Sequence, residues 1–269
     1  PFHTTMKKRV LLLILVTILL LPTVLSQNGK QYHLKLLAVQ EDSNGFSGSD
    51  ADLYLELKEG SGRVFLETFP LTKTDTQIST RFAKDIACNH FKLDCQKHDF
   101  IYTIKAKSNI IGGPSAGAAI SALTAIAMMD LKYDKEITIT ATVNSGGTIG
   151  PVGGVKDKLD AAAEAGLKKV MIAQGTNVPI GGNETNQSID FIAYGKENLS
   201  LEVVEVAALD DVVFHLTGKQ FNNINYTVTE SKEYTDIMKG LKQVVCGRTE
   251  ELQSSLKNVS DNVKTNQGR

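Results

Sequence analysis

The sequence predicts an α+β fold, and three segments with different hydrophobic periods carry that prediction. Apolar residues alternate strictly in Ala51–Lys58, which places three leucines on one face of a strand. They recur at helical spacing in Asp75–Cys88, and they fill almost all of Ala116–Met129. Several strands precede the first helix, so a regular alternation of strand and helix is not expected.

The opening of the folded part is predicted to be an antiparallel meander. Short glycine-rich turns separate its strands, which favours pairing between consecutive strands. These strands are Tyr32–Gln40, Ala51–Lys58 and Arg63–Phe69. After the helix Asp75–Cys88, the segment Phe100–Ala106 returns to a strand pattern.

Strands and helices mix in the second half. Ala116–Met129 has very little polarity, so this helix is expected to be buried. Lys156–Ala165 is a predicted helix that ends at Gly166, a residue suited to a C-cap. Residues 174–188 are rich in Gly, Asn, Thr and Pro, which predicts a loop. The remaining elements are expected at Glu136–Val143, Lys168–Ala173, Leu201–Val206 and Leu209–Leu216.

Composition divides the chain into a leader (1–26), a folded domain (32–217) and a C-terminal extension (228–269). Four apolar residues of the extension lie seven apart, which predicts an amphipathic helix. They are Met238, Val245, Leu252 and Val259. Either this helix forms a short coiled coil, or it packs back onto its own domain.

The leader has the pattern of a secretory signal. Lys7, Lys8 and Arg9 precede Val10–Leu25, an uncharged run of 16 residues. An uncleaved membrane anchor is the alternative, because 16 residues are only slightly short of a spanning helix. In both cases the positive residues stay in the cytoplasm. The rest of the chain is then exported, either extracellular or anchored with the folded domain outside.

The charge balance argues against a nucleic-acid partner. Lys and Arg number 29 and Asp and Glu number 30, so the net charge is −1. The sequence shows no basic stripe of the kind that binds a phosphate backbone.

Two cysteines, Cys88 and Cys95, lie close together, and export makes a disulfide between them plausible. His90 and His98 lie beside them, so the four residues are also candidate zinc ligands. Their spacing is not one of the usual zinc patterns. Two ordinary thiols at a helix end are the third interpretation.

Ser115 lies in Gly113–Gly117, a glycine-flanked turn before the apolar helix. Glycine lets the backbone bend sharply and exposes the hydroxyl. The N–H groups of Gly112, Gly113 and Ser115 are candidate donors for an oxyanion near the start of that helix. Pro114 has no N–H and cannot contribute. A structural glycine turn without a catalytic role is the alternative.

Lys158 follows Ser115 by 43 residues, one turn into a helix with small apolar neighbours. A serine hydroxyl becomes a good nucleophile when a base takes its proton, and a buried neutral lysine is such a base. Its pKa must then fall several units below about 10.4. Thr140, at the end of an apolar strand, is a candidate hydrogen-bond partner for the amine. Lys156 represents the alternative, an ordinary solvated lysine.

The segments GPSAG (Gly113–Gly117) and PVGGVKDKLDAAAEAG (Pro151–Gly166), with Thr140 between them, resemble the proteolytic domain of the Lon family. The resemblance covers about residues 32–216. It implies the Lon proteolytic fold, a Ser-Lys serine peptidase without cofactor or metal, and a ring of commonly six subunits. The nucleophile, the base and the supporting residue that it assigns are Ser115, Lys158 and Thr140.

The chain departs from the family at two points. Many Lon proteins carry an acidic residue three positions before the serine, where this chain has Gly112. Substrate binding or control of the site is therefore expected to differ. The sequence also has no G-x-x-x-x-G-K-[ST] loop for nucleotide. It resembles the exported, stand-alone Lon-domain proteins of archaea, which implies ATP-independent cleavage of peptides, flexible segments or unfolded chains.

Two other functions fit parts of the sequence. A Ser-Asp-His hydrolase would use Ser115 with His215 and either Asp210 or Asp211, in the chain order of α/β-hydrolases. Against it, no predicted strand runs directly into Gly113. An exported scaffold without catalysis would keep the fold as a platform and act through the C-terminal helix.

Overall fold

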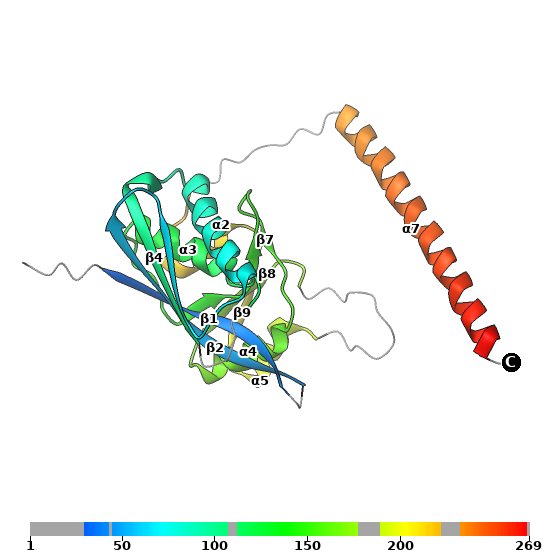
Figure 1. Cartoon of the computed structure of the whole chain (residues 1–269), viewed down its shortest axis with the longest axis horizontal. Coiled ribbons are helices and arrows are strands. Elements are labelled where there is room, and N and C mark those ends of the chain that lie inside the picture. Colours follow the sequence, from blue (N-terminus) through cyan, green and yellow to red (C-terminus); the bar gives the residue numbers. More distant parts are fainter. Residues whose placement is uncertain (1–29, 43–44, 107–111, 177–188, 222–231, 268–269) are drawn as a thin grey trace, which may run out of the picture. The chain divides into compact units, whose positions relative to one another are not determined.

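The computed structural model describes residues 30–42, 45–106, 112–176, 189–221 and 232–267 (Figure 1). The chain divides after Phe221 into a folded domain and a second unit, and each is described by itself. The predicted leader and most of the predicted loop 174–188 lie outside the described residues. Within the described ranges, no helix combines the length and the apolar character needed to cross a membrane.

The first sheet of the domain has four strands in the order β1-β2-β4-β3 (Figure 1). β1 (Gln31–Asp42) pairs antiparallel with β2 (Gly45–Glu59). β2 also pairs antiparallel with β4 (His98–Ala106). β3 (Val64–Phe69) runs parallel to β4. The sheet is therefore mixed, as an α+β fold allows.

The predicted meander is right for its first two strands and wrong for the third. The expected partner of β3 was β2, but β4 takes the place between them. The chain leaves β3 through α2 (Thr74–His90) before it enters β4, and a crossover through a helix joins parallel strands. Phe100, Tyr102 and Ile104 of β4 are fully buried, as suits a central strand.

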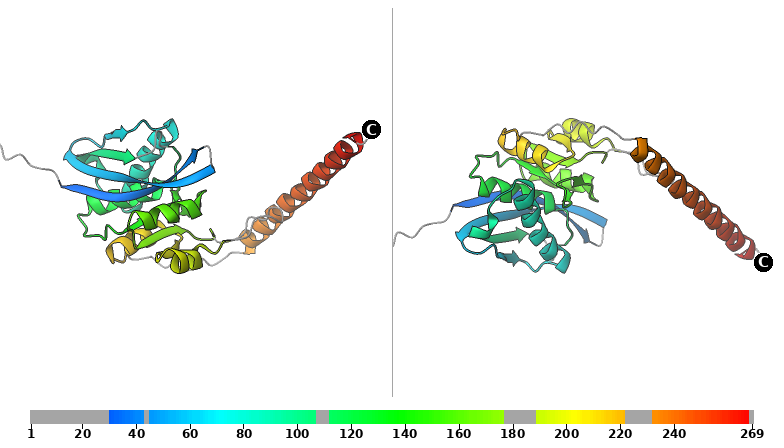
Figure 2. Two further views of the ribbon diagram at one scale, coloured as in Figure 1. Left: turned by 90° about the horizontal axis from the view of Figure 1, so that it is seen from below. Right: turned by 90° about the horizontal axis from the view of Figure 1, so that it is seen from above.

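Two helices, α2 and α3 (Gly117–Met128), lie side by side against this sheet (Figures 1 and 2). Residues 117–127 are all buried, which confirms the prediction of a buried helix. Its few polar side chains are hydrogen-bonded, as burial requires. Thr124 and Tyr102 share a hydrogen bond of 2.7 Å, and Ser121 Oγ donates to the Ala83 carbonyl of α2 at 2.8 Å.

The second sheet is parallel and separates two apolar cores. Alternate residues of its central strand point to opposite faces. Val170 and Ile172 pack with α4 and α5, whereas Met171 and Ala173 belong to the core that contains α3 and α6. The strands, in spatial order, are β5 (Ile137–Ile139), β8 (Lys169–Ala173) and β9 (Glu202–Val206). The helices are α4 (Val155–Glu164), α5 (Phe191–Asn198) and α6 (Leu209–Thr217).

The helix α5 was not predicted. Its sequence FIAYGKEN is short, and it contains Gly195, which lowers helix propensity. Asp190 starts the helix, because its Oδ1 accepts from the N–H groups of Ile192 and Ala193 at 3.0 Å. A Cβ on Gly195 would lie 2.4 Å from Val203 Cγ2, so packing against β9 requires the glycine.

The predicted strand Glu136–Val143 is broken in the middle. β5 ends at Ile139, and the next two-residue strand, β6 (Thr142–Val143), pairs with β7 (Ile149–Gly150). The break lies at Thr140 and Ala141, because the N–H of Thr140 bonds to β8 and the N–H of Ala141 bonds to Ser115.

Cys88 and Cys95 form a disulfide, which confirms the predicted pair. The bond joins the end of α2 to a short 3₁₀ turn, η1 (Cys95–Lys97), just before β4. The zinc alternative is wrong, because both sulfurs are in the covalent bond and His90 Nε2 lies 2.5 Å from Asp210 Oδ2. In the part of the chain that the structure describes, no cluster of three or more His, Cys, Asp or Glu could hold a metal ion.

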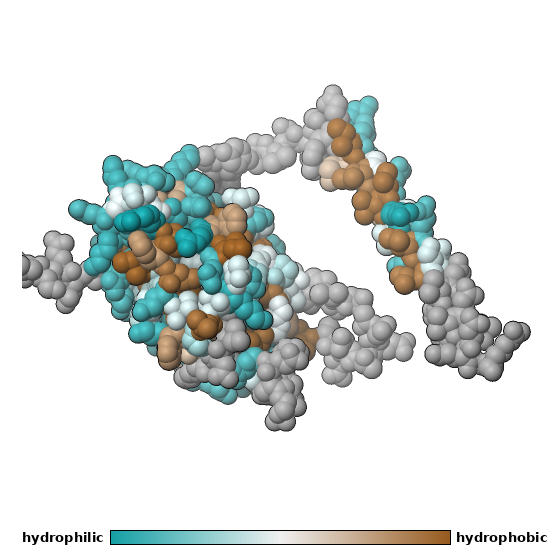
Figure 3. All heavy atoms as spheres, in the orientation of Figure 1, coloured by the Kyte–Doolittle hydropathy of each residue, from teal (hydrophilic) through white to brown (hydrophobic). Residues whose placement is uncertain are grey.

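The second unit contains one long helix, α7 (Lys232–Gln267), so the predicted helix is confirmed. Apolar side chains are exposed along it, seen as brown spheres in Figure 3. Each is 43–70% exposed, and they are Ile237, Met238, Leu241, Val244, Val245, Leu252 and Leu256. The side chain of Val259 lies outside the described residues. Exposed apolar surface of this kind usually marks an interaction site.

Candidate active site

Ser115 sits in a backbone turn directly before α3. Gly113 has a φ of 93°, a conformation that favours glycine. The N–H of Gly117 donates to the carbonyl of Pro114 at 2.9 Å and closes the turn. Ser115 is half-buried, whereas the helix that follows is buried. The turn therefore presents Ser115 at the N-terminal end of a firmly packed helix.

The segment after β5 holds this turn through the backbone. The N–H of Ala141 donates to the Ser115 carbonyl at 3.1 Å, and the N–H of Ala118 donates to the Ala141 carbonyl at 3.2 Å. Thr140, one residue earlier, donates its N–H to the Met171 carbonyl of β8 at 3.1 Å. These three bonds bring Thr140 to the Ser115 turn and tie both to the parallel sheet.

Lys158 comes from α4, where its side chain is on the buried face and only 3% exposed. Two glycines let this helix approach the first sheet closely. A Cβ on Gly48 of β2 would lie 1.8 Å from the Asp157 carbonyl oxygen. A Cβ on Gly154, just before α4, would lie 2.6 Å from Val39 Cγ1 of β1. The helix that carries Lys158 is thus seated against β1 and β2.

Burial lowers the pKa of Lys158 to about 8, from an ordinary value of 10.5. Among the residues that the structure describes, no carboxylate pairs with it to restore the charged form. Lys156, on the same helix, is the opposite case. It is exposed and lies 2.8 Å from Asp160 Oδ2, which raises the pKa of Lys156. Of these two lysines, Lys158 is therefore the one suited to act as a base.

The hydroxyl of Thr140 is buried and has no hydrogen-bond partner among the described residues. A buried hydroxyl without a partner costs about 1–3 kcal/mol. Thr138, two residues earlier, shows the usual solution, because its hydroxyl donates to the Lys35 carbonyl at 2.5 Å. Thr140 therefore keeps an unused hydrogen-bonding group next to the Ser115 turn.

A cavity of about 510 Å³ opens beside this turn, within the size range of ligand sites. Pro114 and Gly117 line it next to Ser115. Ile78 and Phe82 of α2 and Val143 of β6 make its wall largely apolar. An apolar side chain of a substrate would fit such a cavity.

The first turn of α2 holds the loop before Ser115. The N–H of Gly113, a candidate oxyanion donor, donates to Asp75 Oδ2 at 3.0 Å. The Thr76 hydroxyl lies 3.4 Å from the Gly113 carbonyl. A Cβ on Gly112 would lie 2.8 Å from Lys73 Cδ, so the lysine stem packs on that glycine. One of the three predicted oxyanion donors is thus already occupied in this structure.

His215 and Thr140 lie toward opposite ends of the parallel strands. Its pKa is lowered by burial and by the charge of Lys169, and Glu202 is another charged neighbour. Lys169 and Glu202 begin β8 and β9, whereas Thr140 follows the end of β5. The length of the strands therefore separates His215 from Thr140 and from the Ser115 turn to which Ala141 bonds.

The two carboxylates considered as partners of His215 have other contacts. Asp210 binds His90, and Asp211 Oδ2 accepts from the N–H of Ala208 at 3.0 Å at the start of α6. The geometry gives no support to a Ser-Asp-His arrangement.

Sequence reasoning missed two residues that shape the site. Asp75 contacts a residue 38 positions away, and nothing in its local pattern indicates that contact. Gly48 falls in the glycine-rich turn predicted between Tyr32–Gln40 and Ala51–Lys58, but it lies inside β2. A glycine within a strand often marks close approach of another backbone, which is the signal that could have identified it.

Residues 96–218 match the Lon protease (S16) C-terminal proteolytic domain. The matched segment contains Ser115, Thr140 and Lys158. The match begins at the entry to β4 and ends just after α6, so it omits β1, β2, β3 and α2.

Curated relatives are similar to this chain over segments of different lengths. The chain is 28% identical over 176 residues to a Lon protease of Clostridium beijerinckii, covering 64% of this chain and 21% of that protein. It is 30% identical over 201 residues to a Lon protease of Lachnoclostridium phytofermentans, covering 70% of this chain and 24% of that protein. An archaeal Lon protease of Methanothermobacter thermautotrophicus is 31% identical over 110 residues, and the match covers 40% of this chain and 15% of that protein.

The matched part spans about a quarter or less of the length of each of these relatives. Within that part the fold, the mixed sheets and the packed helices agree with the resemblance seen in the sequence. The segment from residue 96 to residue 218 therefore belongs to the Lon proteolytic-domain family, and the chain contains a serine peptidase domain.

Proposed function

We propose that this chain is an endopeptidase in which Ser115 is the nucleophile and Lys158 is the general base. The observation that carries the proposal is the burial of Lys158 without a carboxylate partner among the described residues, which lowers its pKa to about 8. Activation of a serine by lysine needs that neutral amine. In the working site, the Thr140 hydroxyl, which has no partner among the described residues of this structure, accepts a hydrogen bond from the Lys158 amine and orients its lone pair.

In the first chemical step, neutral Lys158 Nζ accepts the Ser115 proton while Oγ attacks the substrate carbonyl carbon. Backbone N–H groups at the turn and the positive end of α3 stabilise the negative oxygen that forms. Lys158 then gives its proton to the leaving amine as the C–N bond breaks. Water hydrolyses the acyl-enzyme by the same route, with Lys158 taking the proton from water and returning it to Ser115.

We propose unfolded or flexible polypeptides as substrates, cleaved without nucleotide. The 269-residue sequence contains no G-x-x-x-x-G-K-[ST] motif. Ile78 and Phe82 make the wall of the cavity apolar, and folded proteins bury most of the large apolar side chains that would fill it. A chain with no stable fold offers those side chains freely.

Export of the domain is also proposed. Lys7, Lys8 and Arg9 before Val10–Leu25 have the pattern of a secretory signal or an anchor. The Cys88–Cys95 disulfide supports an oxidising compartment, because such bonds are rare where thiols are kept reduced.

Self-assembly is the fourth part of the proposal, and the apolar row of α7 supports it. Leu241 and Leu252 lie on that row, 54% and 51% exposed. Pairing with the same helix of a second copy would bury both. Light scattering should show an oligomer that L241D/L252D weakens. The control K239E, at another exposed position of α7, should leave the oligomer intact. A wild-type monomer at all concentrations would contradict this part.

The catalytic assignment is tested with a fluorophosphonate probe and a casein digest. The wild type should be labelled at Ser115 and should cleave casein at the same rate with and without ATP and magnesium. S115A and K158A should lose both signals, while K156A, the exposed neighbour on the same helix, should keep them. Labelling or cleavage that survives in S115A or K158A would refute the dyad. Strict ATP dependence would refute nucleotide-free action alone.

A further inference from the structure

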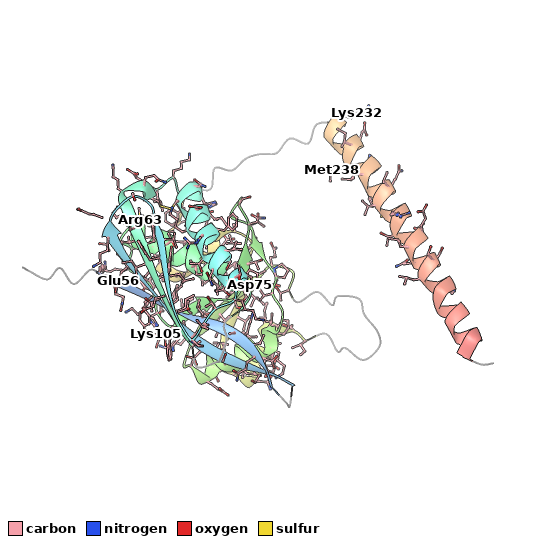
Figure 4. All side chains as sticks on the ribbon, in the orientation of Figure 1. Glu56, Arg63, Asp75, Lys105, Lys232 and Met238 are labelled. Atoms are coloured by element: carbon pink, nitrogen blue, oxygen red, sulfur yellow. A yellow bond between two sulfur atoms is a disulfide. The ribbon has the colours of Figure 1, made fainter. Side chains whose placement is uncertain are left out.

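The carboxylate of Asp75 occupies a backbone donor next to the proposed nucleophile. Its Oδ2 accepts from the Gly113 N–H at 3.0 Å, and its Oδ1 accepts from the Thr76 N–H at 2.7 Å (Figure 4 labels Asp75). Gly113 lies two residues before Ser115. A negative group therefore rests where the mechanism needs positive potential.

The contact is stable in the resting protein for a simple electrostatic reason. Asp75 lies in the first turn of α2, where unpaired N–H groups and the helix dipole attract a carboxylate. Thr76, beside it, is 1% exposed and anchors that turn to the domain. The helix thus presents the carboxylate to Gly113 from a fixed base.

The contact is also able to open. Asp75 itself is exposed, so its side chain can rotate into water without disturbing the core. It lines the same cavity as Ile78, Phe82 and Pro114. A substrate side chain that enters this cavity therefore meets Asp75 before the reaction can occur.

We propose that Asp75 is a latch on the oxyanion site. In the resting enzyme its carboxylate holds the Gly113 N–H, and substrate that fills the cavity displaces it and releases this donor for the carbonyl oxygen. The latch rests on the proposed function of Ser115 and Lys158. It couples activity to occupation of the cavity, because an empty site keeps its donor covered.

The test uses a peptidyl boronate with an apolar side chain next to boron. Ser115 Oγ adds to boron as its proton passes to Lys158, and the product is an anionic tetrahedral boronate that has a hydroxyl oxygen at the oxyanion position and no leaving group. D75A should bind this inhibitor about tenfold more tightly than the wild type, because no carboxylate competes for the donor. The KM for a peptide substrate should change little. The affinity of D75N for the boronate should lie between those of the wild type and D75A, because its neutral amide oxygen still accepts the hydrogen bond from Gly113.

D94N is the matched control, because Asp94 is an exposed carboxylate that pairs with Lys97 away from the turn. Its affinity for the boronate should equal that of the wild type. Unchanged or weaker binding in D75A would overturn the latch and make Asp75 a brace for the loop. If D75A does not fold, D75N decides in the same way. A boronate that binds S115A as well as the wild type would instead refute the proposed nucleophile.

Discussion

The backbone N–H of Ala141 donates to the carbonyl of Ser115 at 3.1 Å. This bond makes the turn of the proposed nucleophile and the strand end that carries Thr140 one rigid piece, because α3 also bonds to Ala141. Lys158 reaches the domain interior from a different element, α4. Its position depends on how that helix packs, so perturbing the base and perturbing the nucleophile should have separable effects.

Activity should rise with pH through about 8. As the proposed base, Lys158 can accept a proton only when its amine is neutral, and burial lowers the pKa of that amine to about 8. kcat/KM for a fluorogenic peptide, measured from pH 6 to 10, should follow this single titration. K158A and K158R should each lose more than about 10³-fold, since alanine has no amine and arginine stays charged. A profile that falls with pH would exclude a lysine base.

Removing Lys158 should stabilise the fold at neutral pH. The pKa of Lys158 is about 8 in the folded protein and about 10.4 in the unfolded chain, so the unfolded chain binds more protons between these values. The free energy of unfolding of the wild type should therefore rise as pH increases from 8 to 10.5. At pH 7 the burial cost is fully present, and K158M should be more stable by about 3 kcal/mol.

Urea unfolding of both proteins from pH 7 to 10.5 measures this difference. The advantage of K158M should shrink as pH rises. K156M is the control, because its parent residue is exposed and paired with Asp160, and its stability relative to wild type should not follow this trend. A K158M protein less stable than the wild type at pH 7 would contradict the burial cost.

Thr140→Val should separate stability from catalysis. Valine has a similar shape and removes a buried hydroxyl that has no partner among the described residues, so unfolding should cost the same or up to about 1 kcal/mol more. kcat should nevertheless fall by about tenfold or more, because the Lys158 amine loses the hydroxyl that we propose orients it during catalysis. T140S keeps the hydroxyl and should retain most of kcat. Equal activity in T140V and the wild type would remove Thr140 from the site.

Gly48→Ala should misplace the proposed base. Its new Cβ would meet the Asp157 carbonyl at 1.8 Å, so α4 must move away from β2. We expect a loss of about 2 kcal/mol or more in stability and a matching loss of kcat. G153A is the control, because a Cβ there meets no atom within 4 Å. The kcat and the melting temperature of G48A and of G153A, each compared with the wild type, check this prediction.

Local pattern was enough to predict most elements, and the motifs together with the family resemblance gave Ser115, Lys158 and the supporting Thr140 as the proposed site. The GPSAG turn and the run of small residues after it predict a sharp bend into a buried helix, which α3 confirms. The helix around Lys158 is also where its period places it. In both cases the decisive interactions lie within a few residues of each other.

Contacts between distant segments were not predictable in the same way. The insertion of β4 between β2 and β3 depends on which edge is free after α2 crosses the sheet, and no local period reports that. Thr140 and Ala141 break a strand because they bond to β8 and to the Ser115 turn instead of continuing one ladder. The local sequence around Asp75 gives no signal either, because its contact is with Gly113, 38 residues away.

The close packing of α4 on β2 limits how short a catalytically active fragment of this chain can be. Gly48 and Val39, the residues that α4 and its cap approach, precede the segment 96–218 that matches the Lon family. A fragment trimmed to that segment would retain Ser115, Thr140 and Lys158 yet have no surface to fix the direction of the lysine. The smallest active fragment must therefore begin before β1, and a fragment cut at the boundaries of the family match, residues 96–218, would be too short.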